Sequence, residues 1–402
     1  MIYLDNSATS FPKPQRVREA AAAAVNNMSN PGRSGHALSI RASEEIYRAR
    51  KTAAALFNAG AESDVVFTLN CTSAINTVLK GVLKSGDHVV VSSLEHNAVM
   101  RPLEGMKKIG VTYTEARVYP FDNDRTVDSF RRSINSRTKM IVCTHASNVW
   151  GIRLPVERLA ALAHEYGLLI AVDAAQSAGV VPIDLQDSRV DYLCAAGHKG
   201  LYGPMGTGML IINSGTVPEP LAEGGTGSNS LSFEQPDELP DRLESGTPNV
   251  SGIAGLRAGM EFVMRMTPEK IAAHEFMLIK RLYRGLSSMK GIELYLPEPD
   301  PGYSVPILSF NFEGADSETA ASMLNRRGIA VRAGLHCSPL AHKMAGTLER
   351  GAVRMSPSAF TGAADIDRTL SAVASVRKEL NAAGGGAEPA AQSLRSRIRV
   401  HR

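Results

Sequence analysis

The sequence has few cysteines and no long apolar run, and both shortages exclude classes of protein. Its 402 residues hold four cysteines, at 71, 143, 194 and 337, and this wide spacing excludes a disulfide-rich scaffold and a zinc ribbon. No apolar run approaches the roughly 20 residues of a membrane-spanning helix, and the first residues lack the basic and apolar regions of a signal peptide. We therefore expect a cytoplasmic protein in a reducing compartment, with no membrane contact and no metal site.

Net charge is also small. The chain carries 44 Lys and Arg against 40 Asp and Glu, for a formal charge of +4, which is too weak to indicate a nucleic-acid partner. A hydrophobic content of 44% and a charged content of 21% are ordinary globular values and exclude a collagen-like or disordered chain. The excess of base is local, because the last eleven residues contain four arginines and no acid.

Apolar, β-branched stretches alternate with helical patterns through the first two thirds of the chain. The stretches typical of strands are 65–68, 88–93, 140–144, 168–172, 192–194 and 208–212, and those typical of helices are 71–83, 99–109 and 156–166. Near-continuous apolar strands spaced by helices indicate a mostly parallel sheet that is covered on both faces. The sequence therefore predicts an α/β fold.

The pattern changes after about Gly246. Helical patterns at 252–266 and 268–289 precede strand patterns at 292–296, 305–312, 329–333 and 352–356, which together predict a smaller α+β domain. We expect a large domain at 14–250, a smaller C-terminal domain formed by 251–380 with the N-terminal residues 1–13, and a flexible basic tail at 381–402. The Gly-, Pro- and Ser-rich stretch 215–248 predicts an irregular connection.

An acid ends one predicted strand and a lysine follows the next. Asp173 directly follows the apolar stretch 168–172, which places its carboxylate at the sheet edge where open α/β sheets bind ligands; a helix N-cap is the alternative. Lys199 lies among glycines after an apolar stretch. A lysine in such a setting can have a lowered pKa and form a Schiff base, although most lysines are simply solvated. Together they match the lysine and acid that pyridoxal phosphate chemistry requires.

A candidate phosphate site lies earlier in the chain. Residues 70–74, Asn-Cys-Thr-Ser-Ala, follow the strand pattern 65–68 and begin a helix. Backbone N–H groups, the helix dipole and the Thr72 hydroxyl would form an anion cradle there. Ordinary helix capping by Thr72 or Ser73 is the alternative.

Several motifs are shared with one known family. They are Tyr3-Leu-Asp-Asn-Ser-Ala-Thr, Leu94-Glu-His96-Asn-Ala, Ser147-Asn148-Val-Trp-Gly, Asp173-Ala-Ala-Gln176, Gly197-His198-Lys199 and Arg332-Ala-Gly-Leu-His-Cys337. The chain resembles the class V aminotransferase family of fold-type I pyridoxal phosphate enzymes, and within it the cysteine desulfurases and selenocysteine lyases. The resemblance extends to about residue 380, and the short Arg332–Cys337 spacing is similar to the Suf-type, group II enzymes.

The resemblance implies roles around the cofactor ring. Lys199 would hold the cofactor aldehyde and move protons, while Asp173 would pair with the pyridine nitrogen. His96 would stack on the ring face. Gln176 and Asn148 would lie near the phenolic oxygen and the substrate.

Further roles concern the phosphate. The resemblance implies that Cys71, Thr72 and His198 surround it, and that Thr247 reaches the phosphate of a neighbouring subunit, which implies a homodimer with shared active sites. Two positions depart from the family pattern, because Cys71 stands where threonine is common and Ala196 where a hydroxyl residue is frequent. Both departures predict weaker cofactor binding.

Cys337 decides between reactions. A glycine, a histidine and a proline flank it, which predicts an exposed and constrained loop, whereas the cysteines at 143 and 194 lie inside apolar strands and are predicted core residues. Arg332, His336 and His342 would lower the pKa of the Cys337 thiol.

The function implied by the resemblance is that of a cysteine desulfurase. Arg354 would clamp the carboxylate of L-cysteine by a bidentate bond, beside Asn148 and Ala8, and the Cys337 thiolate would take the sulfur as a persulfide, leaving L-alanine, before transfer to an acceptor protein. Alternatives are a selenocysteine lyase acting on L-selenocysteine, and a class V aminotransferase, epimerase or carbon–sulfur lyase that does not use Cys337. A scaffold that binds partners through the basic tail is opposed by the intact set of Lys199, Asp173 and Arg354.

Overall fold

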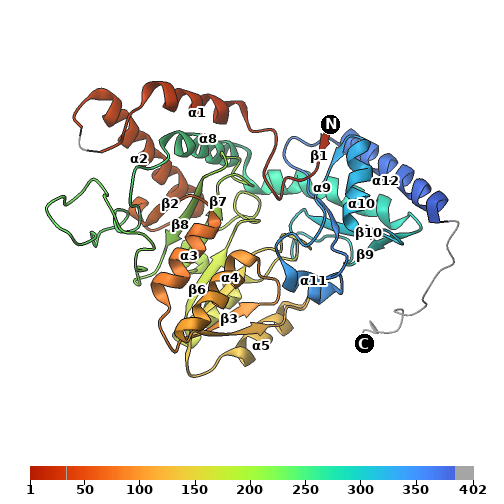
Figure 1. Ribbon diagram of the computed structural model, residues 1–402, viewed down its shortest axis with the longest axis horizontal. Coiled ribbons are helices and arrows are strands. Elements are labelled where there is room, and N and C mark those ends of the chain that lie inside the picture. The colour runs from red at the N-terminus through yellow and green to blue at the C-terminus, as the bar shows by residue number, and fades with distance from the viewer. Residues whose placement is uncertain (33, 385–402) are drawn as a thin grey trace.

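The structure is a computed structural model that describes residues 1–32 and 34–384. Two bodies lie side by side: a larger one built around a seven-stranded sheet and a smaller one that holds the N-terminus and the C-terminal helix (Figure 1). Within the described residues, no helix combines the length and the apolar character that crossing a membrane requires.

The large sheet is mostly parallel, as predicted. Its strands are β2 (Val65–Thr68), β3 (His88–Ser92), β4 (Thr112–Ala116), β5 (Thr138–Thr144), β6 (Leu169–Asp173), β7 (Tyr192–Ala196) and β8 (Gly208–Ile212), in the order β2-β8-β7-β6-β5-β3-β4. Only β8 runs antiparallel to its neighbours, β2 and β7. The sequence missed β4 because it is an edge strand whose side chains, apart from Ala116, are not buried, so it lacks the apolar pattern of the other strands.

Helices cover both faces of this sheet. One face packs against α3 (Cys71–Val82) and α4 (Asn97–Met106), which the short 3-10 helix η2 (Lys107–Ile109) extends. The other face packs against α2 (Ala37–Phe57), α5 (Asn123–Ser133), α6 (Val156–Glu165) and α8 (Val250–Met266). The short elements η1 (Glu62–Asp64) and α7 (Leu185–Ser188) complete this body.

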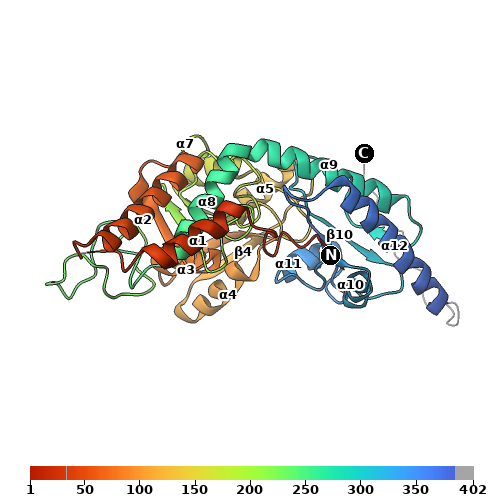
Figure 2. The same cartoon turned by 90° about the horizontal axis from the view of Figure 1, so that it is seen from above.

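Helix α8 links the two bodies. It packs against α1 (Gln15–Asn27) and α2, and its side chains Leu256 and Met260 belong to the core of the large sheet. The following helix, α9 (Pro268–Ser287), leads into the smaller body (Figure 2). The domain limits 14–250 and 251–380 stay a prediction, and α8, which they assign to the smaller domain, makes most of its helix contacts with α1 and α2 of the larger one.

The smaller body has its own core. It contains β9 (Ile292–Leu294), β10 (Leu308–Phe312), α10 (Ser317–Arg326), β11 (Ile329–Ala330), α11 (Pro339–Ala345), β12 (Val353–Met355) and α12 (Ala363–Gly384). Strands β9, β10 and β12 form an antiparallel sheet, and β1 (Ile2–Tyr3) pairs with β11. Because Leu4 enters the same core as Phe310 and Val373, the N-terminal residues are part of this body.

Two predicted irregular segments have different outcomes. The stretch 215–248 contains no helix or strand, as expected. Helix α12 continues to Gly384 and so extends into the segment predicted as a tail, while the rest of that tail, 385–402, lies outside the described residues.

A turn beside Lys199 gives a test of the fold. Gly179 has a φ of +83°, and a Cβ there would lie 2.2 Å from the Gly200 carbonyl oxygen. We expect Gly179→Ala to lower the free energy of unfolding by about 2–3 kcal/mol, since the clash adds to the left-handed backbone. Gly167→Ala is the control, because Gly167 has a φ of +65° and a Cβ there would contact no other atom within 4 Å. We expect this variant to lower the free energy of unfolding by only about 1 kcal/mol. If urea denaturation shows the same loss of unfolding free energy in both variants, the predicted clash at Gly179 is wrong.

Candidate active site

A cavity of about 500 Å³ opens at the carboxyl ends of β5, β6 and β7. Eight of the predicted site residues line it: Cys71, Thr72, His96, Asn148, Asp173, Gln176, His198 and Lys199. They come from strand ends and from the first turns of α3 and α4, segments that parallel topology brings to one edge of the sheet. The fold thus gathers most of the predicted site in one place.

Lys199 and Asp173 form the polar centre of this cavity. Asp173 is the last residue of β6 and is 5% exposed; its Oδ1 accepts a hydrogen bond of 2.9 Å from the Ala175 N–H. Lys199 follows the neighbouring strand β7. Burial lowers the pKa of Lys199, and the Asp173 carboxylate partly opposes that shift. A buried carboxylate with so few donors fits a cationic partner such as a protonated ring nitrogen.

The first turn of α3 forms one end of the cavity. The N-cap is Asn70, whose Oδ1 accepts a hydrogen bond of 2.9 Å from the Ser73 N–H. The alternative of capping by Thr72 or Ser73 is therefore wrong, and Thr72 stays exposed on the cavity wall. Nearby, the buried His198 Nδ1 has no hydrogen-bond partner within the described residues. Free helix amides, a hydroxyl and an unpartnered ring nitrogen fit the oxygens of a phosphate.

The Cys71 side chain contacts Asp173 and strand β7. Its Sγ lies 3.4 Å from Asp173 Oδ1 and 3.4 Å from the Cys194 carbonyl oxygen. Burial, followed by the charge of Asp173, raises the pKa of the Cys71 thiol. Only the backbone N–H of Cys71 therefore remains as a donor toward an anion at the helix start.

His96 begins α4 on another wall of the cavity. Its Nδ1 accepts a hydrogen bond of 3.0 Å from the Ala98 N–H, and burial lowers the pKa of the imidazole. The preceding residue, Glu95, was not singled out from the sequence. It is fully buried, accepts a 2.7 Å bond from the Thr144 N–H, and burial raises its pKa to about 8. The sequence signal for Glu95 is its place as an acidic residue between the end of β3 and His96.

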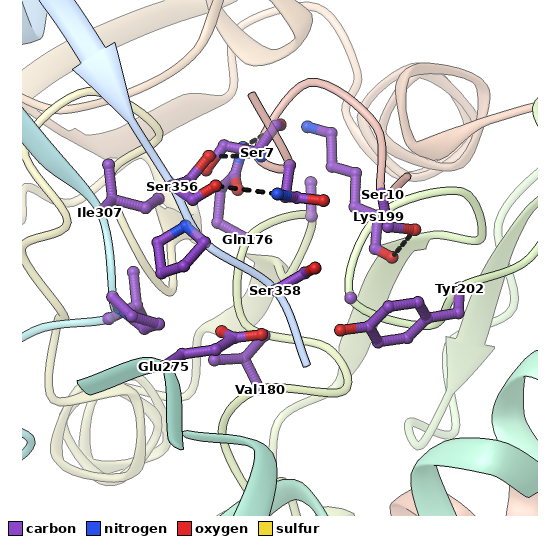
Figure 3. A pocket seen from close by; sticks show the side chains of 16 residues that line it. Ser7, Ser10, Gln176, Val180, Lys199, Tyr202, Glu275, Ile307, Ser356 and Ser358 are labelled. Atoms are coloured by element: carbon purple, nitrogen blue, oxygen red, sulfur yellow. Dashed lines mark hydrogen bonds between the residues drawn. The ribbon is translucent and has the colours of Figure 1, made fainter. Parts of the chain in front are cut away.

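A second cavity, of about 420 Å³, lies beside the first (Figure 3). Gln176 and Lys199 line both cavities, and the Gln176 side chain donates to the Ser7 carbonyl oxygen at 3.1 Å. On the far side, Tyr202 and Glu275 point toward each other, and burial raises the pKa of Glu275 to about 8. Ala8, predicted to contact the substrate, is not among the residues that line either cavity.

The N-terminal segment holds the turn that carries Lys199. The carbonyl oxygen of His198 accepts hydrogen bonds from the Ser10 N–H at 3.0 Å, the Thr9 hydroxyl at 3.0 Å and Lys13 Nζ at 2.7 Å. Burial lowers the pKa of Lys13 to about 8. No sequence pattern indicates this role of Lys13, because these contacts join segments about 185 residues apart.

Arg354 lies beneath the site and is 1% exposed. One guanidinium nitrogen donates to Asp5 Oδ1 at 2.7 Å and another to the Asn148 carbonyl oxygen at 2.9 Å, while its Nε has no partner within the described residues. The backbone of Arg332 forms an isolated antiparallel β-bridge with that of Arg354. The Arg332 side chain is half-buried and pairs with no carboxylate in the described part of the chain. The two arginines leave N–H groups for an anion.

Cys337 is exposed, whereas the other three cysteines are buried. It lines a third cavity of about 1210 Å³ beside α3 and α4, and this cavity shares Thr72 and His96 with the first. The exposed loop predicted for Cys337 is therefore present. Thr247, also exposed, lies in the irregular segment and is not among the residues that line these cavities.

Two histidines near Cys337 do not carry the charge that was predicted. Burial lowers the pKa of His336 to about 2 and that of His342 to about 4. Both rings are therefore neutral at neutral pH, and the prediction that they supply positive charge to the thiol is wrong. Arg332 remains the cation of this loop.

Comparison with known proteins decides the family. The model of the aminotransferase class V family matches residues 2–369. The chain belongs to the class V aminotransferase family. A probable cysteine desulfurase from Methanothermobacter thermautotrophicus is 33% identical over 87% of this chain and 88% of its own length, and a cysteine desulfurase from Haloferax volcanii is 32% identical over 94% and 90%.

Solved structures agree with this class V assignment. The apo cysteine desulfurase from Thermococcus onnurineus NA1 matches with a TM-score of 0.88 and 30% identity over 94% of this chain and 95% of that one. The cysteine desulfurase CsdA from Escherichia coli matches with a TM-score of 0.84 and 29% identity, over 94% of each chain. The predicted fold-type I architecture and the resemblance to cysteine desulfurases are confirmed.

The burial of the cysteines predicts how this class V enzyme reacts with thiol reagents. We expect Ellman's reagent to modify Cys337 alone within minutes in the native protein, because Cys71, Cys143 and Cys194 are buried and burial raises their thiol pKa values. All four thiols should react in urea, and peptide mass spectrometry identifies the modified sites. Native labelling of Cys71 as fast as Cys337 would contradict the arrangement.

Proposed function

We propose that this protein is a pyridoxal phosphate-dependent cysteine desulfurase, which converts L-cysteine to L-alanine and keeps the sulfur as a persulfide on Cys337 for an acceptor protein. The observation that carries the proposal is the position of Cys337. Its exposed thiol lines a cavity that shares Thr72 and His96 with the cavity of Lys199 and Asp173. A nucleophilic thiol therefore lines a cavity that adjoins the one holding the lysine and acid that the cofactor requires.

The side chains of the first cavity suit this cofactor. Lys199 would bind its aldehyde, Asp173 its ring nitrogen, and the His198 Nδ1 with the Thr72 hydroxyl its phosphate. His96 would cover the ring face, with Gln176 and Asn148 at its edge and the Cys71 N–H near the phosphate. When bound, the cofactor supplies an electron sink for the negative charge that develops on the substrate.

The residues of the chain carry the remaining chemistry. Burial lowers the pKa of Lys199, and its amine would accept and return a proton at the substrate carbon. The Cys337 thiolate attacks the substrate sulfur, so that a sulfur–sulfur bond forms as the carbon–sulfur bond breaks. The electron pair of the broken bond stays with the carbon, which takes up a proton to become the methyl group of alanine.

Two arginines suit the substrate carboxylate. Arg354 has a buried Nε–H without a partner, and Arg332 has no paired carboxylate within the described residues. We assign the carboxylate to these two groups, which agrees with the predicted role of Arg354 and adds Arg332. Ala8 stays a prediction; its N–H is used in a tight turn with the Asp5 carbonyl oxygen at 3.0 Å.

The irregular segment supports a homodimer. Leu231 and Phe233 have exposed fractions of 98% and 108%, which is costly in water for two large apolar side chains on one loop. The same segment carries Thr247, which lies away from the cavities of its own chain. We assign this segment to a contact with a second copy, where Thr247 would complete the phosphate site.

The activity is tested with L-cysteine and L-selenocysteine as separate substrates. We expect L-alanine and sulfide from L-cysteine in the presence of a reductant, and a loss of at least about 100-fold in kcat for Cys337→Ala, since the nucleophile is gone. Leu335→Ala, in the same loop and 39% exposed, is the matched control and should keep most of the activity.

Other outcomes would change the assignment. If Cys337→Ala turns over L-cysteine at the wild-type rate, the persulfide route is excluded. If the wild-type protein turns over L-selenocysteine and not L-cysteine, it is a selenocysteine lyase. A cofactor absorption band that persists in Lys199→Ala would contradict the assignment of the cofactor lysine.

The dimer is tested by light scattering. The wild-type chain of 43.0 kDa should show twice the mass of one chain. The dimer dissociation constant of the double variant Leu231→Ser/Phe233→Ser should be at least about tenfold higher than that of the wild type, because interface energy concentrates in buried aromatic and apolar anchors. Met277→Ser, an exposed apolar residue of α9, is the control. A monomeric wild type would contradict the assignment.

A further inference from the structure

One side chain binds both residues that flank Cys337. Asn148 Nδ2 donates to the His336 carbonyl oxygen at 2.7 Å, and Asn148 Oδ1 accepts from the Ser338 hydroxyl at 2.6 Å. Asn148 is 9% exposed and Ser338 is fully buried, so water competes little for these bonds. Both ends of the amide are therefore engaged with the loop of the nucleophile.

The loop adopts a backbone that needs such support. His336 and Cys337 have φ values of +52° and +56°, and two consecutive residues with side chains rarely adopt this left-handed conformation. Strained backbone of this kind persists where the surroundings over-determine it, often at functional sites. Besides the bonds to Asn148, the Cys337 carbonyl oxygen accepts from the Asn97 N–H at 2.8 Å, which fixes the loop against α4.

The same asparagine is connected to the arginine beneath the site. Arg354 donates to the Asn148 carbonyl oxygen at 2.9 Å, and two residues along, the Trp150 indole donates to the Ala341 carbonyl oxygen at 2.8 Å. Ala341 belongs to α11, which directly follows the loop. Segment 148–150 of the large body thus holds the loop and its following helix in the smaller body.

We propose that Asn148 and Ser338 form a clamp that sets the position of the Cys337 thiol for attack on the substrate sulfur, with Asn148 acting as a positioning residue. The inference rests on the proposed function. It gives Asn148 a task beyond the cofactor and substrate contacts predicted from the resemblance, and the amide keeps one N–H for those contacts. Sulfur transfer depends on reacting atoms about 3–3.5 Å apart, and a displacement of about 1 Å can cost about 100-fold in rate.

The first test removes one bond of the clamp at Ser338, a residue that is not among those lining the cofactor cavity. We expect Ser338→Ala to lower the single-turnover rate of persulfide formation on Cys337 by about tenfold or more, with KM for L-cysteine and the cofactor absorption band changed less than twofold. Ser309→Ala is the matched control, because it deletes a buried hydroxyl that bonds the neighbouring Val149 carbonyl oxygen at 2.5 Å and does not bind the loop. It should leave the rate within twofold of wild type.

Combining variants separates a clamp from independent contacts. If Asn148 and Ser338 act as one unit, the double variant Asn148→Ala/Ser338→Ala forms persulfide no more than twofold slower than Asn148→Ala alone. If the rate losses of the two single variants multiply in the double variant, the proposal is overturned. An unchanged rate in Ser338→Ala together with a raised KM in Asn148→Ala would also overturn it, because Asn148 would then be a substrate contact only.

A third measurement does not depend on the activity. Hydrogen exchange of peptides covering 332–343 should be at least about tenfold faster in Ser338→Ala and in Asn148→Asp, whose second oxygen would face the His336 carbonyl, and unchanged in Ser309→Ala. Unchanged exchange in both clamp variants would overturn the proposal even if the enzyme is active. Faster exchange in a protein that does not turn over L-cysteine would refute the proposed function while supporting the clamp.

Discussion

The buried guanidinium of Arg354 is the contact on which the arrangement of the site depends. A cation that is 1% exposed must be paired, because burying it alone is costly. Its partners are Asp5 of the N-terminal segment and the Asn148 carbonyl oxygen of the large body, and Arg354 itself lies on β12 of the smaller body. Three segments distant in sequence are therefore fixed together at the place where substrate and thiol must meet.

Burial also determines which titratable groups carry charge. Glu95 is buried and forms no ion pair within the described residues, and its pKa rises to about 8, whereas the pKa of the buried His336 falls to about 2. The same desolvation makes the acid and the base neutral at neutral pH. Positive charge near Cys337 comes from Arg332, since a guanidinium keeps its proton when partly buried, and from Lys80 and Arg101, which line the same cavity as the thiol. The Arg332 cation thus lies in the same loop as the neutral His336 imidazole.

The sequence predicts the buried parts of the fold well, because strong apolar patterns are local. The strand at 208–212 has the predicted limits, while the edge strand β4 was missed because it carries polar, exposed residues. At the site, the motifs identify the residues that line the cavity, but their orientations depend on tertiary contacts. The Cys71 thiol contacts Asp173 at the end of β6, and Lys13 reaches His198 only because the chain folds back.

The reaction requires a thiol that is both reactive and held in place, and these demands conflict in a loop. An exposed loop gives Cys337 access to substrate and acceptor, but exposure alone would leave its position poorly defined. The structure resolves this conflict by burying the neighbours of the cysteine instead of the cysteine: His336 is 3% exposed and Ser338 is fully buried. Because hydrogen bonds to buried groups are costly to break, the backbone on both sides of the thiol is fixed while its sulfur stays accessible.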